Sequence, residues 1–400
     1  MAIPVIERLA NTAPGLEIWL DSSPLVYRSW MQKMLVSAPR ENKQELEKQL
    51  LNLFDPDDVC NSIVKGVTTN PKLSLIAIQE DPNKWKGWIE GYLKSHDTRD
   101  VEHVFWQLYK EIVRNGAEML MPLFESSGYR YGFLSGQLDP RNLFNQEIML
   151  EQAHELVELS PNIMVKVPGS HEGMTVLRKL TASGISTNCT LCYTVPQYIA
   201  AANAVQAGFE EARAKGVDLT RWRSVITAMN ARWENASIFN EQAEKEGIQL
   251  TAEHKILASS AIFKRAYRLF RARAYPSKML ICSVRTGPVV NGRRRIWHLE
   301  ETAGADAVFT LPIVFYSELY TDYFDSPEIQ FTPAIWRDIP ESYWNDLIRI
   351  PYFVQSFEED GIASPDFNDI MALQNTYKEF SGATEEMVDF VREMIAAIEI

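Results

Sequence analysis

The sequence is poor in cysteine and contains no long apolar run. Its 400 residues include four cysteines, Cys60, Cys189, Cys192 and Cys282. Four are too few for a disulfide scaffold, and residues 1–20 lack the basic start and apolar stretch of a secretion signal. The sequence contains no stretch of about 18 apolar residues, which a membrane-spanning helix would need. We therefore expect a protein of the reducing cytoplasm that has no membrane partner.

Groupings typical of metal ligands are also missing. The six histidines show no ligand spacing. Cys189 and Cys192 form one C-x-x-C, but they fall in an expected strand, where residues three apart point to opposite faces. On that geometry the two thiols can neither share a metal nor easily form a disulfide. We expect the pair to be accidental and the protein to carry no metal.

Positive charge is in deficit. Lysine and arginine number 40 against 53 acidic residues, a net charge of −13. This balance argues against nucleic acid or an anionic membrane as a partner, although local arginines can still bind a small anionic substrate. Two basic groupings, residues 293–295 and the set Lys264, Arg265, Arg268, Arg271 and Arg273, are expected to be solvated surface.

Short β-branched or aromatic runs alternate with stretches of helical periodicity. The eight runs are 16–21, 65–70, 131–139, 163–168, 184–191, 224–230, 279–285 and 307–311. Helices are expected over 145–159, 195–215 and 252–274. This order predicts an α/β protein, and a closed (β/α)8 barrel is a simpler solution than a doubly wound sheet. We expect one barrel domain over residues 1–400, with additional C-terminal helices that cap it after about residue 313.

Polar residues gather at the ends of the predicted strands, where a barrel carries its active site. They are Asp21, Thr68, Asn70, Gln137, Asp139, Lys166, Asn188, Thr190, Thr227, Ser283 and Arg285. Residues two apart on a strand share a face. The pairs 68/70, 188/190 and 283/285 are therefore expected to point into the barrel together.

Lys166 stands in the apolar run Ile-Met-Val-Lys-Val-Pro-Gly (163–169), with no carboxylate beside it. A lysine that faces a barrel interior loses hydration, which lowers its pKa from about 10.4 and favours the neutral amine. A neutral amine attacks a ketone and forms an imine. The spacing leaves an alternative open, in which the lysine extends to water from an edge strand.

Five ordered motifs resemble those of the transaldolase family over nearly the whole chain. They are Ile-Trp-Leu-Asp (18–21), Gly-Val-Thr-Thr-Asn-Pro (66–71), Ser-Gly-Gln-Leu-Asp-Pro-Arg (135–141), Val-Lys-Val-Pro-Gly (165–169) and Gly-Ile-Ser-Thr-Asn-Cys-Thr-Leu (184–191). The resemblance implies that Lys166 forms a Schiff base and that Asp21 handles the proton of the substrate C4 hydroxyl. It also implies that Thr190 positions a catalytic water, with Gln137 as the fourth catalytic position.

The resemblance further implies a substrate site for sugars or sugar phosphates, with no organic cofactor. The implied substrate-binding residues are Asn70, Thr68, Asn188, Thr227, Arg232, Ser283 and Arg285. The two asparagines would hold hydroxyls of a dihydroxyacetone unit, and Ser283 with the two arginines would hold a phosphate. A scaffold role suits Thr68 better than a chemical one, and Thr69, Asp139 and Arg141 are expected to be structural. A homodimer is a further expectation.

The chain departs from the family at Gln137, where the family has a glutamate that serves as general acid and base with a bound water. Glutamine can orient water but cannot exchange a proton. The related fructose-6-phosphate aldolases also have glutamine there, but they supply a nearby tyrosine. The position expected for it holds Met229, and the usual serine is Thr227. Tyr193 and Tyr131 are near in sequence, without a sign that they reach the site.

Three hypotheses follow from this comparison. The first is a transaldolase-type transferase that passes a three-carbon unit from a ketose to an aldehyde. The second, motivated by Gln137, is an aldolase of the fructose-6-phosphate type, or a biosynthetic one with an altered substrate. The third is a sugar-phosphate-binding homologue without aldol chemistry. Trapping of an imine separates the first two from the third, and the need for an acceptor separates the first from the second.

Overall fold

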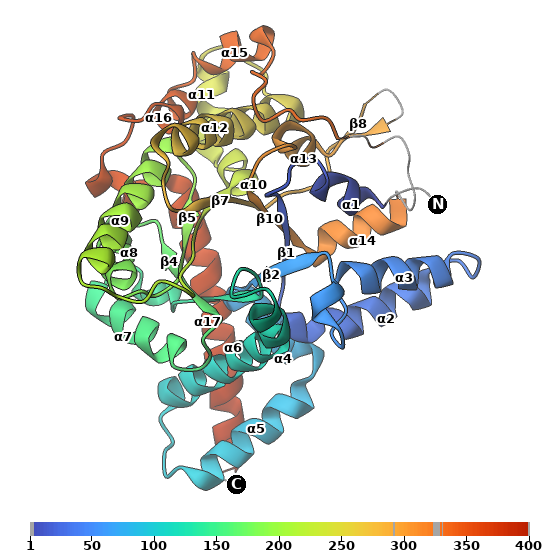
Figure 1. Cartoon of the computed structure of the whole chain (residues 1–400), viewed down its shortest axis with the longest axis vertical. Coiled ribbons are helices and arrows are strands. Elements are labelled where there is room, and N and C mark those ends of the chain that lie inside the picture. The colour runs from blue at the N-terminus through green and yellow to red at the C-terminus, as the bar shows by residue number, and fades with distance from the viewer. Residues whose placement is uncertain (1–3, 291–292, 323–328, 330, 399–400) are drawn as a thin grey trace.

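Eight parallel strands close into a barrel in the order β1-β10-β7-β6-β5-β4-β3-β2 (Figure 1). The computed structural model describes residues 4–290, 293–322, 329 and 331–398, so parts of the predicted C-terminal region lie outside it. The strands are β1 Glu17–Asp21, β2 Val64–Thr68, β3 Phe133–Gln137, β4 Ile163–Pro168, β5 Thr187–Cys192, β6 Ser224–Met229, β7 Lys278–Cys282 and β10 Val308–Pro312. Each overlaps one predicted run, so the closed barrel is confirmed over the doubly wound alternative.

The three predicted helices are confirmed as α7 Gln146–Val157, α9 Val195–Ala214 and α12 Ala252–Arg273. Their starts follow from local side-chain chemistry. Asn145 accepts hydrogen bonds from two backbone amides of α7, and Thr194 caps α9 ahead of a proline in its first turn. Thr251 and His254 form a reciprocal capping box on α12.

The remaining helices cover the outside of the barrel and the connections between its strands (Figure 1). They are α1 Val5–Ala10, α2 Tyr27–Ser37, α3 Lys43–Leu53, α4 Pro71–Glu80, α5 Pro82–Ser95, α6 Val101–Ser126, α8 His171–Ala182, α10 Asn230–Glu234, α11 Ser237–Lys245 and α13 Trp297–Thr302. Short 3-10 turns are η1 Pro24–Val26, η2 Val59–Asn61, η3 Pro140–Asn142 and η4 Ser364–Asp369. An antiparallel pair, β8 Val289–Val290 and β9 Arg293–Arg294, lies between β7 and α13. Within the described residues, no helix is both long and apolar enough to cross a bilayer.

The expected C-terminal helices are confirmed. They are α14 Ile313–Asp322, α15 Glu341–Leu347, α16 Pro351–Phe357 and α17 Met371–Ile398. The long helix α17 packs against α4 and α6 and ends near α5 (Figure 1). Its buried side chains, including Leu373, Phe380, Met387 and Val391, recur at helical spacing and form one apolar stripe.

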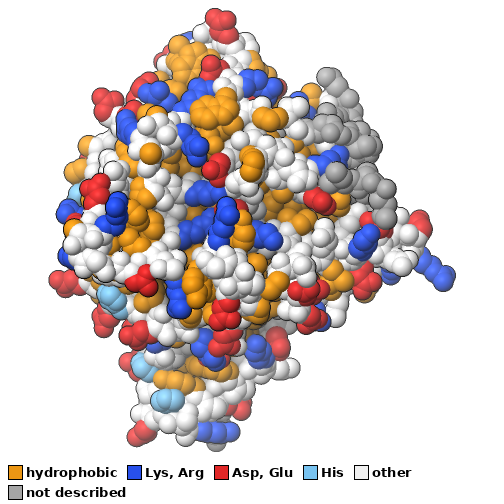
Figure 2. Space-filling model, in the orientation of Figure 1, with side chains coloured by type: hydrophobic (Ala, Val, Ile, Leu, Met, Phe, Trp, Pro, Cys, Tyr) orange, Lys and Arg blue, Asp and Glu red, His pale blue; other side chains and the backbone are white. Residues whose placement is uncertain are grey.

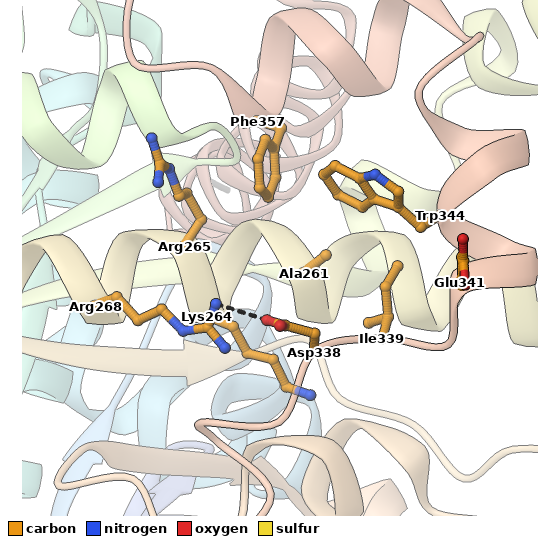
Figure 3. A pocket seen from close by; sticks show the side chains of 9 residues that line it. All are labelled: Ala261, Lys264, Arg265, Arg268, Asp338, Ile339, Glu341, Trp344 and Phe357. Carbon is orange, nitrogen blue, oxygen red and sulfur yellow. Dashed lines mark ion pairs between the residues drawn. The ribbon is translucent and has the colours of Figure 1, made fainter.

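The basic set on α12 is only partly the solvated surface that the sequence predicts. Lys264 is 2% exposed, and its ammonium donates to Glu301 at 2.7 Å and to the carbonyl of Arg337 at 3.0 Å. The prediction was wrong for this residue because α13, which carries Glu301, and the C-terminal segment, which carries Arg337, both pack on α12. Between α12, α15 and α16 this leaves a pocket of about 360 Å³ in which Arg268 pairs with Asp338 at 2.8 Å (Figure 3). None of the predicted site residues lines this pocket.

The prediction that Cys189 and Cys192 point apart was also wrong. Their sulfur atoms lie 3.3 Å apart, and both side chains are buried. Leu191 adopts a left-handed backbone with φ of 55°, and the register of β5 against β6 shifts between the two cysteines. This bulge breaks the strand alternation on which the prediction rested. Both cysteines are free thiols, and no group of three or more metal-ligating side chains is formed by the described residues.

The surface carries mixed charge. On the face drawn in Figure 2, Lys and Arg side chains are interspersed with Asp and Glu, and hydrophobic side chains form small separate groups. The net charge of −13 is therefore not displayed there as one acidic field.

Candidate functional site at the carboxyl ends of the barrel strands

Lys166 on β4 is buried, with 5% of its surface exposed. Its ammonium donates to the backbone carbonyl of Thr69 at 2.9 Å, and no ion pair of the described residues includes it. Register places it between Gln137 of β3 and Asn188 of β5. The alternative of a lysine that extends to water from an edge strand is excluded, because a closed barrel has no edge strand and the side chain is buried.

Asp21 ends β1, and one hydroxyl holds its carboxylate. Thr68 on β2 donates to Asp21 Oδ1 at 2.8 Å, and its hydroxyl also lies 2.7 Å from that of Thr310 on β10. Thr68 thus fixes the carboxylate, in keeping with the scaffold role expected for it. Thr310 was not among the predicted residues, although it is the only polar side chain in the apolar run 307–311.

Burial moves the ionisation of Asp21 and Lys166 toward their neutral forms. Desolvation raises the pKa of Asp21, and the charges of Lys166 and Arg232 and the hydrogen bond from Thr68 oppose this shift only in part. Desolvation lowers the pKa of Lys166, and Asp21 opposes that change. A lysine with a lowered pKa has a larger neutral fraction at physiological pH, which is the form that attacks a carbonyl.

A chain of buried polar side chains crosses β3, β5 and β6. The hydroxyl of Thr227 donates to Asn188 Oδ1 at 2.6 Å, and Asn188 Nδ2 donates to the hydroxyl of Ser135 at 3.0 Å. Thr190 is two residues along the same strand, and its hydroxyl oxygen lies 3.8 Å from Met229 Sδ. The structure therefore brings Asn188 and Thr227 together beside Lys166 and places Thr190 two residues further along β5.

Gln137 is 3% exposed, and its Oε1 has no hydrogen-bond partner among the described residues. Its backbone is fixed on both sides by the hydroxyl of Tyr109, which donates to the Gln137 carbonyl at 2.7 Å and accepts from its amide at 3.0 Å. A buried acceptor without a protein partner normally binds water or a ligand. This is the feature that a water-orienting or hydroxyl-binding residue presents.

The tyrosines considered from the sequence are engaged elsewhere. The hydroxyl of Tyr193 donates to Thr376 on α17 at 2.7 Å. Tyr131 precedes β3, at the opposite end of that strand from Gln137, and its ring lies 5.8 Å from the ammonium of Lys65. In the described structure neither hydroxyl is placed to substitute for the missing glutamate.

The two predicted phosphate arginines are each paired with a carboxylate. Arg232 on α10 lies 2.5 Å from Glu379 of α17, which also accepts from Lys72 at 2.9 Å. Arg285 lies 2.5 Å from Glu234 of α10. Neither acidic residue was predicted. Glu379 gives no sequence signal because it stands 147 residues from Arg232.

Glu234 is completely buried and has three partners. It accepts from Ser259 at 2.6 Å and lies 2.6 Å from His298 Nε2, besides its contact with Arg285. Burial acts to raise the pKa of Glu234, but the charge and hydrogen bond of His298, the charge of Arg285 and the hydrogen bond from Ser259 outweigh it and hold the pKa below the usual value. This network fixes the position of the Arg285 guanidinium.

Two of the residue pairs that were predicted to share one face of a strand do not do so, because the strands end before the second residue of the pair. β2 stops at Thr68, and the side chain of Asn70 caps α4 by accepting from the Leu73 amide at 3.0 Å. β7 stops at Cys282, and Ser283 has a left-handed φ of 54°. The same-face argument for 68/70 and 283/285 therefore does not hold, although all four residues remain at the mouth of the barrel.

Thr69, Asp139 and Arg141 make contacts within the protein. The Thr69 hydroxyl donates to the carbonyl of Ser135 at 2.8 Å. Arg141 pairs with Asp139 at 2.6 Å and with two further glutamates, one of them Glu385 of α17 at 3.0 Å. These contacts suit the structural roles expected for the three residues.

Fold and site together define a closed parallel barrel with a buried lysine among polar side chains at its carboxyl end. The family model described as transaldolase/fructose-6-phosphate aldolase matches residues 49–371, and the chain therefore belongs to this family. It is similar to a transaldolase of Thiobacillus denitrificans, 29% identical over 267 residues that cover 62% of this chain and 72% of the relative. It also resembles transaldolase 1 of Streptomyces avermitilis, 29% identical over 272 residues, 66% of this chain and 63% of that protein.

Proposed function

We propose that this protein transfers a three-carbon dihydroxyacetone unit from a ketose to an aldehyde through an imine on Lys166. The observation that carries the proposal is the buried amine, which is bonded to a backbone carbonyl and has no carboxylate in ion-pair contact among the described residues. Membership of the family and the names of the relatives support the same chemistry.

The steps assign one task to each group. The neutral Lys166 amine adds to the substrate C2 carbonyl, and loss of water gives the protonated imine. Asp21 takes the proton of the C4 hydroxyl, the bond between C3 and C4 breaks, and the first aldehyde leaves. The electron pair of that bond remains on the three-carbon unit as an enamine. The enamine attacks the acceptor aldehyde, and Asp21 returns its proton to the oxygen of that aldehyde, which becomes the new C4 hydroxyl. Hydrolysis of the new imine, with water held near Gln137 and Thr190, frees the product.

Borohydride trapping tests the proposal. Incubation with dihydroxyacetone or fructose 6-phosphate, followed by reduction, is expected to leave a three-carbon adduct on the peptide that contains Lys166. Lys179→Met, which changes an exposed lysine on α8, is the matched control and is expected to trap like the wild type. Absence of an adduct with both donors would reject the proposal and favour a binding protein without aldol chemistry.

The second candidate is an aldolase that releases the three-carbon unit without an acceptor. Gln137 favours it, because the fructose-6-phosphate aldolases, which the motifs of this chain resemble, also have glutamine at this position. Release of glyceraldehyde 3-phosphate from fructose 6-phosphate distinguishes the two candidates. Release without an added aldehyde supports the aldolase, and strict dependence on erythrose 4-phosphate supports the transferase.

Gln137→Glu is expected to raise transaldolase turnover by up to about a hundredfold, the lower range of what a positioned acid–base group contributes. The buried site would raise the pKa of the new carboxyl, so that it can both hold and release a proton near neutral pH. Steady-state rates with fructose 6-phosphate and erythrose 4-phosphate measure the effect. Unchanged or lower turnover, with trapping intact, would mean that the pocket is adapted to glutamine.

Arg285→Ala is expected to raise KM for phosphorylated acceptors by at least about tenfold and to change KM for free sugars little. An arginine that binds a phosphate through charge-assisted hydrogen bonds contributes roughly 1.5–3 kcal/mol, which an uncharged sugar does not use. KM values for erythrose 4-phosphate and erythrose make the comparison. Equal changes for both acceptors would remove the phosphate role from Arg285.

A further inference from the structure

Helix α17 lies against the mouth of the barrel and contacts residues that follow several strands. Its Thr376 accepts from Tyr193 after β5 at 2.7 Å, and its Glu385 pairs with Arg141 after β3 at 3.0 Å. Glu379, between them, pairs with Lys72 after β2 and with Arg232 after β6. The helix therefore joins loops from different sides of the candidate site.

Arg232 and Lys72 form a two-cation anion site, and Glu379 occupies it. The carboxylate lies 2.5 Å from Arg232 and 2.9 Å from Lys72, with one oxygen directed to each cation. The hydrogen bond from Arg232 lowers the pKa of Glu379 to about 2, so this group is an anion at neutral pH. The guanidinium also lies 5.0 Å from the ring of Phe380, which holds it beside the helix.

The two carboxylates that pair with the predicted phosphate arginines differ in how easily another anion can displace them. Glu234 is 0% exposed and has partners on His298 and Ser259 besides Arg285, so withdrawing it would leave several buried groups unpaired. Glu379 is 37% exposed and stands on an outer helix, and its partners Arg232 and Lys72 are 26% and 54% exposed. Pairs of this kind exchange partners at little cost in free energy.

We propose that Glu379 is a displaceable internal anion and that the phosphate of the substrate binds to Arg232 and Lys72 by taking its place. The inference rests on the proposed function, because it assumes that Arg232 meets the substrate phosphate. It adds Lys72 as a phosphate ligand and means that phosphate binding breaks the two ion pairs by which Glu379 joins α17 to the barrel mouth. A phosphate dianion carries more charge than the carboxylate and competes with it, whereas an unphosphorylated sugar leaves the ion pair in place.

Titration calorimetry with inorganic phosphate, at constant ionic strength, tests the competition directly. Glu379→Gln removes the internal anion and is expected to tighten phosphate binding about tenfold, because binding no longer has to break the ion pairs or approach a carboxylate. Glu386→Gln changes an exposed acid on the same helix and is the matched control, expected to bind like the wild type. Lys72→Gln is expected to weaken phosphate binding.

Outcomes of this titration are independent of the imine chemistry. Equal phosphate affinity in the wild type and Glu379→Gln, or no measurable binding in either, would overturn the inference even if dihydroxyacetone is trapped on Lys166. A tenfold gain in phosphate affinity that is seen in Glu379→Gln and not in Glu386→Gln supports the inference, even if trapping fails and the proposed function is rejected. Faster amide hydrogen exchange around Glu379 when the wild type binds phosphate is expected as well, and slower exchange there would contradict the loss of its two ion pairs.

Discussion

A Lys166→Met variant is expected to give no three-carbon adduct after borohydride reduction and to retain less than about a thousandth of wild-type turnover. The amine is the only group in the proposed reaction that forms a covalent bond with the substrate. Methionine has a similar length and no nucleophilic nitrogen, so it removes the chemistry with little change in packing. Intact mass after reduction and steady-state turnover measure the two effects.

The stability of this variant separates lost chemistry from lost folding. Burial lowers the pKa of Lys166 in the folded protein, so the lysine destabilises the folded state at any pH below its unfolded pKa. Replacing it with methionine removes that penalty, and the urea midpoint at neutral pH is expected to stay level or rise. Full trapping by Lys166→Met would place the imine on another lysine, and a large drop in the midpoint would leave a folding defect as the cause.

The barrel and its lysine could be predicted because both depend on short-range patterns. Each strand is a short run of β-branched or aromatic residues, and the helices begin at side chains such as Asn145 and Thr194 that cap their first turns. Lys166 stands out since it is the one charged residue in the apolar strand β4. Neither conclusion needs knowledge of what lies across the barrel.

What could not be predicted depends on contacts between distant segments or on single backbone angles. The partner of Arg232 is Glu379 of α17, and the partner of Lys264 is Glu301 of α13. A single left-handed residue, Leu191, brings Cys189 and Cys192 together where strand alternation places them apart. The sequence therefore indicates which side chains gather at the mouth, but not which of them are already paired.

The second large effect is expected at Glu234, which no motif identifies. Glu234→Ala leaves His298 and Ser259 without their buried acceptor and frees the Arg285 guanidinium from its 2.5 Å contact. Breaking a buried ion pair costs roughly 3–5 kcal/mol, and the lower end, about 3 kcal/mol, applies because Arg285 is 38% exposed and regains hydration. Urea unfolding at neutral pH measures the loss. Glu244→Ala, at an exposed position on α11, is the control and should change stability by less than about 0.5 kcal/mol.

The same substitution carries a pH dependence with a definite sign. The folded-state pKa of Glu234 is held below its usual value of about 4.3, so its stabilisation is complete above that pH and disappears as the pH falls through the folded pKa. The difference in unfolding free energy between wild type and Glu234→Ala should therefore be constant near neutrality and shrink in acid. A difference that grew in acid would mean that Glu234 is protonated in the folded protein. Because Arg285 depends on this carboxylate for its position, Glu234→Ala should also raise KM for erythrose 4-phosphate more than for erythrose, which a purely structural role would not produce.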